Sequence, residues 1–277
     1  MKDLKYKLIV SDFDGTLSSS FYVIPQEVVN AVNKYRSAGG KFALCTGRPV
    51  ADTTKILGKE GLVCDAVCYS QGAIVHVGGK PILDAGLDKN LAYDIISLVE
   101  SKWKRKYLVY VDNTMYYTPA TPDVVAHVDF FVNNGGEGVL VDDVLECVKN
   151  VKGSMTKFVI IKGANEDVGE IFKLILDNFG DKVIVNSGNP WFIEVISNQY
   201  TKGTATRLIA KALDISEDDT ITIGDSTNDV EMVKFGFGLA VASGSEKVKQ
   251  VAKRIVPPVQ ELPVKYVIEK ILNDEDL

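Results

Sequence analysis

Strand-like and helix-like patterns alternate at both ends of this 277-residue chain, and this alternation constrains its fold more than any other feature. Apolar runs predict strands, and amphipathic stripes predict helices. The predicted strands are 4–10, 42–45, 66–69, 220–223 and 238–242, and the predicted helices are 26–38, 50–59, 203–213, 229–234, 246–252 and 264–272. Such alternation is typical of right-handed βαβ units and a parallel sheet.

The middle of the chain follows a different pattern. A hairpin is predicted over 73–83, and from residue 84 the pattern is that of an α+β unit. Its predicted helices are 90–103, 124–132 and 168–178, and its predicted strands are 107–111, 115–117, 157–161, 183–186 and 191–196. We therefore expect an α/β protein. A Rossmann-like three-layer αβα core, residues 1–83 and 198–277, is interrupted by an inserted α+β domain, residues 84–197.

Composition argues against a nucleic-acid partner, a membrane span and a structural zinc site. The net charge of −6 argues against a nucleic-acid surface. No apolar run approaches the roughly 18 residues that a membrane span needs, and no signal peptide is recognised. Four cysteines, Cys45, Cys64, Cys68 and Cys147, lack the second pair of soft ligands that a structural zinc site requires. We expect a cytoplasmic protein with free thiols.

Two carboxylates follow the first predicted strand. Asp12 and Asp14 stand two residues apart, and Gly15 and Thr16 then allow a sharp turn. In an open parallel sheet, ligands bind at the carboxyl ends of the strands. Two acids there are badly placed for packing and well placed for chemistry, although an acidic turn is the ordinary alternative.

Three further polar clusters begin where a core strand or helix is predicted to end or start. They are Thr46-Gly47-Arg48, Thr201-Lys202-Gly203 and the run 224–229, which contains Asp225, Asn228 and Asp229. Each alone has an ordinary explanation as a capped loop, a common residue pair or a helix N-cap. Their joint occurrence at predicted element ends favours one shared site over coincidence.

This order of motifs resembles the haloacid dehalogenase-like superfamily of phosphotransferases. The resemblance rests on Asp12 to Thr16, Thr46, Lys202, and the run from Gly224 to Asp229. It covers the two core segments, and the insert between them is similar to the type-2 cap of subclass IIB, the Cof-type sugar-phosphate phosphatases. The resemblance implies Mg²⁺-dependent hydrolysis of phosphomonoesters of small metabolites, with sugar phosphates as the expected substrates.

Physical chemistry explains why such a site needs these residues. A phosphomonoester dianion repels an anionic nucleophile, and Mg²⁺, which prefers oxygen ligands, removes that repulsion. Asp12 is the expected nucleophile, which would form an aspartyl-phosphate. The resemblance gives Asp14 a backbone carbonyl on the metal and a side chain that acts as general acid and then base. Asp12 and Asp225 are the expected carboxylate ligands of the metal, and Asp229 would either bind it directly or support the residues that do.

The remaining candidates are Lys202, which is expected to take part in catalysis, and four residues that would bind phosphate. Thr46 can donate its hydroxyl, and the Gly47 region can offer backbone N–H groups. Lys202 stands at a helix N-terminus, where its charge would attract an anion and keep the nucleophile ionised. Asn228 could bind phosphate or metal-bound water. Arg48 could meet the substrate or pair on the surface.

Specificity is expected to lie in the inserted domain. Asn189, Trp191 and Glu194 are candidates there, although core packing is the better interpretation of Trp191. Two loops depart from the family pattern. Ser243-Gly244-Ser245 replaces the usual Gly-Asn pair, and the proline-rich stretch 257–263 replaces a loop that contains Asn and Gly. Both departures weaken analogy with any single relative's substrate.

Two other functions compete with the phosphatase hypothesis. A phosphomutase would return the phosphoryl group to a second hydroxyl, although Thr46-Gly47-Arg48-Pro49 is closer to the hydrolase pattern. A non-catalytic phospholigand-binding protein would need neither Asp12 nor Asp14. The physiological substrate and the oligomeric state stay open, and a monomer is compatible with the sequence.

Overall fold

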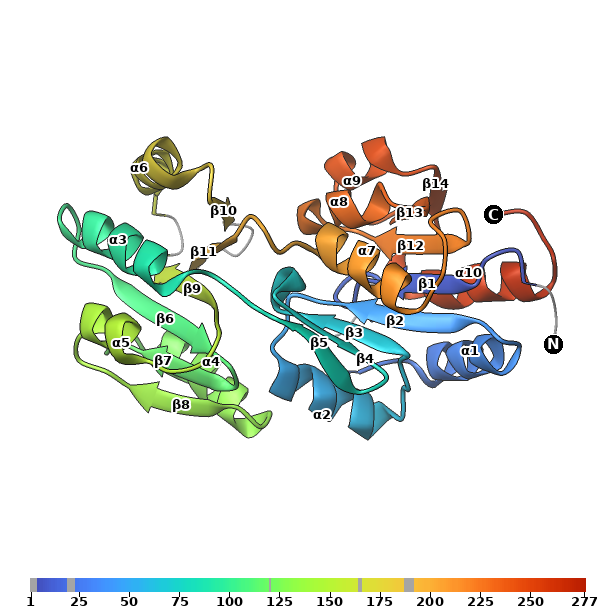
Figure 1. The fold of residues 1–277 in the computed structure, drawn as a ribbon, viewed down its shortest axis with the longest axis horizontal. Helices are drawn as coiled ribbons and strands as arrows, with labels where there is room; N and C mark the ends of the chain where they lie inside the picture. Colours follow the sequence, from blue (N-terminus) through green and yellow to red (C-terminus); the bar gives the residue numbers. More distant parts are fainter. Residues whose placement is uncertain (1–3, 19–22, 120, 164–165, 187–191) are drawn as a thin grey trace. The chain divides into compact units, whose positions relative to one another are not determined.

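The computed structural model describes residues 4–18, 23–119, 121–163, 166–186 and 192–277. The chain forms two compact units (Figure 1). Unit 1 comprises residues 1–48, 53–83 and 201–277, and unit 2 comprises residues 49–52 and 84–200.

Unit 1 is built on an eight-stranded sheet of order β14-β13-β12-β1-β2-β3-β4-β5. The strands are β1 (Leu8–Ser11), β2 (Lys41–Cys45), β3 (Ala66–Tyr69), β4 (Ile74–Val77), β5 (Lys80–Asp84), β12 (Thr220–Gly224), β13 (Phe237–Val241) and β14 (Arg254–Val256). The six strands from β14 to β3 pair in parallel, and β4 runs antiparallel to β3. β1 lies between β12 and β2, with Leu8 opposite Thr220 and Lys41. The N-terminal strand therefore lies at the centre of the sheet.

Helices cover both faces of this sheet. They are α1 (Gln26–Ser37), α2 (Val50–Glu60), α7 (Lys202–Ala212), α8 (Val230–Val233), α9 (Glu246–Val251) and α10 (Pro263–Leu272), with 3₁₀ turns at Ser70–Gly72, Thr227–Asp229 and Val259–Glu261. Leu8 and Val10 pack with residues of α7 and α8 on one face. The alternate residues Ile9 and Phe42 are also fully buried, and α1 packs on β2 and against α10. The predicted three-layer αβα core is confirmed.

Unit 2 contains a six-stranded sheet of order β10-β11-β9-β6-β7-β8. Its strands are β6 (Lys106–Val111), β7 (Thr114–Tyr117), β8 (Glu137–Leu140), β9 (Met155–Ile161), β10 (Val183–Asn186) and β11 (Phe192–Ser197), and its helices are α3 (Lys89–Glu100), α4 (Pro122–Asn133), α5 (Val144–Asn150) and α6 (Gly169–Phe179). The α3, α5 and α6 helices share one apolar cluster with the sheet, while α4 packs on the alternate side chains, such as Leu108 and Val159. Ile193 and Val195 are buried on one face, as predicted, and Trp191 lies outside the described residues.

Short elements escaped the sequence patterns. β14 has three residues, and β8 carries Gly138 and no fully buried side chain, so neither shows strand alternation. The seven-residue α5 is too short for a helical stripe, although Asp143 caps it by accepting hydrogen bonds from the N–H groups of Leu145 and Glu146. These elements depend on the packing of their neighbours.

Two further sequence expectations concern membrane-spanning helices and the state of the cysteines. Across the described stretches of the chain, no helix has the length and apolar character needed to cross a bilayer. All four cysteines are free, and Cys45, Cys68 and Cys147 are buried, as expected for small apolar side chains in strands and helices.

Candidate active site

Three chain segments bring the predicted acidic residues to one edge of the unit 1 sheet. Asp12 directly follows β1, and its N–H donates to the carbonyl of Ile223 on β12 at 2.9 Å. Asp225 directly follows β12, and Lys202 is the first residue of α7. Because β1 and β12 are parallel neighbours, the residues that follow them lie side by side.

Lys202 joins two of the carboxylates. Its Nζ lies 2.5 Å from Oδ1 of Asp12 and 2.6 Å from Oδ1 of Asp229. All three side chains are at most 5 % exposed. A buried charge persists only when it is paired and hydrogen-bonded, so this ammonium and its two acceptors depend on one another.

The cluster holds more negative than positive charge. Burial and the nearby Asp229 carboxylate raise the pKa of Asp12 well above its usual value, against the opposing effect of Lys202. Burial and Asp229 also raise the pKa of Asp225. Burial alone would lower the pKa of Lys202, but Asp12 and Asp229 outweigh it and hold that pKa well above its usual value. One lysine therefore does not balance the acids around it.

Asp229 has a second task in the loop that follows β12. Its Oδ2 accepts hydrogen bonds from the N–H groups of Asp225 at 3.1 Å and Ser226 at 2.9 Å. Gly224 makes this possible, because a Cβ at that position would lie 2.5 Å from Cβ of Asp229. The carboxylate thus fixes the loop that carries Asp225 while it contacts Lys202.

Gly15 and Thr16, which follow Asp14, orient the side chain of Asp225. The Thr16 hydroxyl donates to Oδ1 of Asp225 at 2.9 Å. Gly15 has φ +88°, and a Cβ there would lie only 2.6 Å from Oδ2 of Asp225. The Gly15-Thr16 turn therefore approaches the Asp225 carboxylate as closely as backbone without a side chain allows.

Asp14 and Arg48 form a two-pronged ion pair. Nε and Nη2 of Arg48 donate to Oδ2 and Oδ1 of Asp14 at 2.8 and 2.6 Å. The Asp14 side chain is 47 % exposed, whereas Arg48 is buried over the ring of Phe13. Arg48 therefore forms a part-buried ion pair with Asp14, and its contact with a substrate stays a prediction.

The remaining predicted residues line the same edge. The Thr46 hydroxyl oxygen accepts a hydrogen bond from the N–H of Arg48 at 3.1 Å, and Thr46 is fully buried. Asn228 donates from Nδ2 to Oε1 of Gln71 at 2.9 Å. A Cβ at Gly47 would lie 2.5 Å from Nε2 of Gln71. Gln71 thus links the loops that follow β2 and β12.

The acids fit a hard cation. Oxygen atoms of Asp12, Asp225 and Asp229 lie within 4.8 Å of one another. All three groups are carboxylates, the type of ligand that Mg²⁺ prefers. Burial and the neighbouring carboxylates raise the pKa values of Asp12 and Asp225, as expected where like charges are held together without enough positive charge. The side chain of Asp14 is engaged by Arg48 and is outside this group.

Sequence reasoning missed two contributors. The sequence places Thr16 in the turn and in the motif after β1 but gives it no contact of its own, although a hydroxyl beside two carboxylates was a usable signal. Gln71 follows β3 by two residues and has φ +63°. The expectation that functional side chains follow parallel strands applies to β3 as well, and it would have found Gln71.

Comparison with known proteins identifies the family. A family profile described as haloacid dehalogenase-like hydrolase matches residues 9–268. The chain belongs to this family. The match includes both halves of the carboxylate cluster and the whole of unit 2.

Individual relatives agree. The chain is 28 % identical to phosphatase YwpJ of Bacillus subtilis, over 96 % of this chain and all of that protein. It is 26 % identical to the 5-amino-6-(5-phospho-D-ribitylamino)uracil phosphatase YitU of the same organism, over 94 % of this chain and 95 % of that one. The solved structure of the subclass IIB sugar phosphatase BT4131 shares the fold, with a TM-score of 0.77, 21 % identity, and coverage of 95 % and 98 %. The chain is a hydrolase of the phosphatase type, as predicted.

The departures from the family pattern touch the site. The N–H of Ser245 donates to the carbonyl of Asp225 at 2.7 Å, and a Cβ at Gly244 would lie 2.6 Å from that carbonyl oxygen. The Ser243-Gly244-Ser245 loop therefore supports the backbone of Asp225 in this chain. In unit 2, Glu194 pairs with Lys157 at 2.6 Å, and Asn189 lies outside the described residues.

Proposed function

We propose that this phosphatase hydrolyses phosphomonoesters of small metabolites through an aspartyl-phosphate on Asp12. The observation that carries the proposal is the buried Asp12 carboxylate, paired with Lys202 and close to Asp225 and Asp229. A purely binding site has no need to bury a carboxylate among others, because that placement costs free energy.

The chain's own residues account for both half-reactions. A carboxylate oxygen of Asp12 attacks phosphorus, an O–P bond forms, and the ester O–P bond breaks. The leaving alkoxide takes a proton from Asp14, once its carboxyl group has left Arg48. Water then attacks the aspartyl-phosphate and gives its proton to Asp14, which frees Asp12 and phosphate. Lys202 neutralises charge beside Asp12 throughout.

Asp12, Asp225 and Asp229, with the backbone carbonyl of Asp14, are the residues that we propose to hold Mg²⁺. When bound, the ion would offset the negative charge of the phosphoryl oxygens and of the nucleophile. Thr46, the Gly47 backbone, Arg48 and Asn228 are proposed to bind the phosphoryl group. They line the edge from which Asp12 projects, and hydroxyl, amide and guanidinium donors suit its oxygens.

The substrate class follows from the relatives' names and from the two-unit chain. YitU acts on a phosphorylated ribityl compound, and BT4131 is a sugar phosphatase, so both names describe a phosphate on a polyhydroxylated carbon chain. We propose sugar phosphates or similar polyol phosphates for this chain. Residues 1–83 and 198–277 would supply the chemistry, and residues 84–197 would contact the leaving group.

A phosphate-release screen tests the proposal. Sugar phosphates, nucleotides and pyridoxal phosphate would be offered to the wild-type chain with Mg²⁺ and with EDTA. We expect turnover that requires Mg²⁺, loss of turnover in Asp12→Asn, and wild-type turnover in Asp218→Asn, an exposed residue that precedes β12 at its opposite end. Turnover that survives in Asp12→Asn would refute the covalent mechanism. Isomerisation of hexose 1-phosphate without free phosphate would replace it with a mutase.

A further inference from the structure

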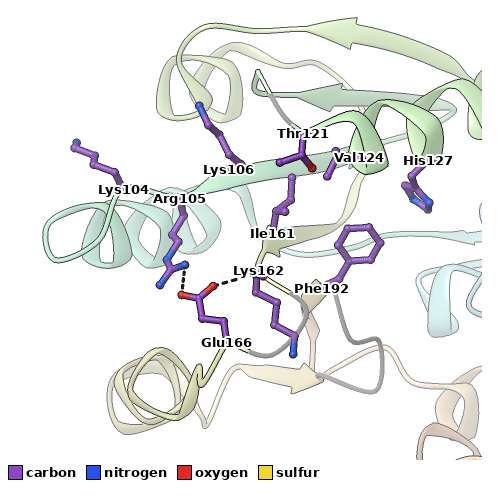
Figure 2. Close-up of a pocket in the computed structure, with 11 residues that line it drawn as sticks. Lys104, Arg105, Lys106, Thr121, Val124, His127, Ile161, Lys162, Glu166 and Phe192 are labelled. Carbon is purple, nitrogen blue, oxygen red and sulfur yellow. Dashed lines mark hydrogen bonds and ion pairs between the residues drawn. The ribbon is translucent and has the colours of Figure 1, made fainter.

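Unit 2 contains a cavity that the proposed chemistry does not use. Its volume is about 520 Å³, which lies within the range of about 300–1,000 Å³ that is typical of small-molecule sites. The lining comes from unit 2 alone, mainly from the start of β6, the end of β9, the start of β11 and the first turns of α4 (Figure 2).

The cavity is positively charged in an acidic protein. Its lining has four basic side chains and one acidic side chain, a balance of three positive charges in a chain of net charge −6. The single acid, Glu166, accepts from Arg105 Nη1 at 2.6 Å and from the N–H of Gly163 at 3.0 Å. Lys106 and Lys162 have no carboxylate within ion-pair distance among the described residues, although Lys162, after Gly163 and Arg105, also helps to lower the pKa of Glu166. Neither ammonium group is held in an ion pair, so both can bind a ligand.

Arg105 adds an unmet donor. Its Nε is buried and has no acceptor in the part of the chain that the structure describes, although its Nη1 is paired with Glu166. A buried N–H without an acceptor is costly, and an anion or its bound water would remove that cost. Thr121, the residue before the twelve-residue α4, also lines the cavity, and its side chain makes no capping hydrogen bond. The positive end of the helix dipole favours negative charge in the same place.

The centre of the cavity is apolar. Ile161 and Phe192 are half-buried, and they pack only in part against the cluster under α4. The ring of His127 lies 5.1 Å from the ring of Phe192, and burial, with Lys157 nearby, lowers the pKa of this histidine. The two rings are tilted by 56° to one another, so the imidazole adds a second aromatic surface at an angle to Phe192. In Figure 2, Lys106 and Lys162 leave this apolar centre in different directions.

We propose that this cavity binds a small organic anion whose flat, apolar body covers Ile161 and Phe192 and whose acidic group meets Lys106, Arg105 or Lys162. The ligand class is an aromatic or heterocyclic compound that bears a phosphate, sulfonate or carboxylate. This site is separate in residues from the Asp12 cluster, and it does not depend on phosphatase activity.

Titration with 8-anilinonaphthalene-1-sulfonate tests the site in the full chain. This probe has the required flat body and one anionic group, it is not a phosphate ester, and its fluorescence rises in apolar surroundings. We expect one probe bound per wild-type chain. The double variant Lys106→Ala/Lys162→Ala should bind at least about tenfold more weakly, which corresponds to about 1.4 kcal/mol.

Two control variants separate the site from general charge and folding effects. Lys149→Ala/Lys152→Ala removes the same charge from exposed positions of unit 2 outside the cavity, and it should leave binding within twofold. Lys106→Arg/Lys162→Arg should retain binding. Circular dichroism melting curves verify that each variant is folded. Equal weakening in both alanine pairs, or unchanged binding in the cavity pair, would overturn the proposal.

Displacement of the probe in EDTA distinguishes the acidic group. Adenosine monophosphate and benzoate would be added at equal concentration, each with a flat body. Stronger displacement by the first identifies a phosphate ligand, and stronger displacement by the second identifies a carboxylate ligand. Failure of both to displace the probe would refute a site for organic anions.

Discussion

Replacing Gly15 by alanine tests whether phosphatase turnover requires the Gly15-Thr16 turn to lie close to the Asp225 carboxylate. A Cβ at Gly15 would lie 2.6 Å from Oδ2, 2.9 Å from Cγ and 3.0 Å from Oδ1 of Asp225. Ordinary contact begins at 3.4 Å, so the carboxylate must retreat by about 0.8 Å. That retreat also strains the hydrogen bond from Thr16, because it ends on the same carboxylate.

The expected effect has two parts of different size. Alanine at φ +88° costs about 1–2 kcal/mol of folding free energy, because Cβ crowds the following carbonyl oxygen. Moving a group at a reacting centre by about 1 Å costs on the order of 100-fold in rate. Gly15→Ala should therefore lose about 100-fold in kcat/KM but remain folded.

Gly61→Ala is the matched control. Gly61 has φ +71°, and a Cβ there would meet nothing within 4 Å, so this variant carries the backbone strain without the collision. Urea denaturation should show similar losses of stability in both variants. Mg²⁺-dependent release of phosphate from a substrate found in the screen should fall only in Gly15→Ala. Activity of Gly15→Ala within threefold of wild type, or an equal loss in Gly61→Ala, would refute the reasoning.

Three other changes probe the same unit. Lys202→Met leaves buried carboxylates without a counter-ion, so urea denaturation should show that the free energy of unfolding falls by about 3–5 kcal/mol. A variant as stable as wild type would contradict the view that Lys202 balances the charge of these carboxylates. Thr16→Val removes the hydroxyl donor to Asp225 while keeping the shape of the side chain. Mg²⁺ affinity measured by calorimetry should fall about tenfold, because Asp225 is then less well oriented. Unchanged affinity would exclude an orienting role for Thr16. Partial burial alone would raise the pKa of Asp65, but hydrogen bonds, chiefly from Arg36, lower it. The ionised Asp65 therefore stabilises the fold above the unfolded pKa of about 3.9. This contribution is lost as the pH falls through the lower pKa of the folded state. Asp65→Asn should therefore be about 1 kcal/mol less stable at pH 7, with a gap that closes below about pH 4; a gap independent of pH would disprove the linkage.

Periodicity predicted the core of this protein well because its central strands are buried. β2 and β3 are continuous apolar runs bounded by polar residues, and α1, which precedes β2, carries a clear apolar stripe. The rule that parallel strands end at one edge then predicts that Asp12 and Asp225 lie close together, and the structure has them so. Short edge elements such as β14 leave no such pattern, because three residues cannot show a period.

Side-chain pairing was less accessible from sequence. Nothing in the spacing of Asp14 and Arg48 says that they form a two-pronged pair, because their meeting depends on rotamers and on the turn after β2. The contact between Gln71 and Asn228 joins loops 157 positions apart. Such contacts arise from the packed loops as a group, and local patterns do not encode them.

The central place of β1 has a consequence for the order in which the protein is made. Lys202 is synthesised 190 residues after Asp12, which at about 5–20 residues per second is a delay of roughly 10–40 s on the ribosome. Meanwhile the continuous stretch 84–200 emerges complete and free to fold. A nascent chain thus carries Asp12 almost from the start but gains the partners of that carboxylate, Lys202 and Asp229, only late in translation. Premature termination anywhere between β2 and α7 would leave Asp12 without its counter-ion Lys202 and without β12, one of the two strands that flank β1.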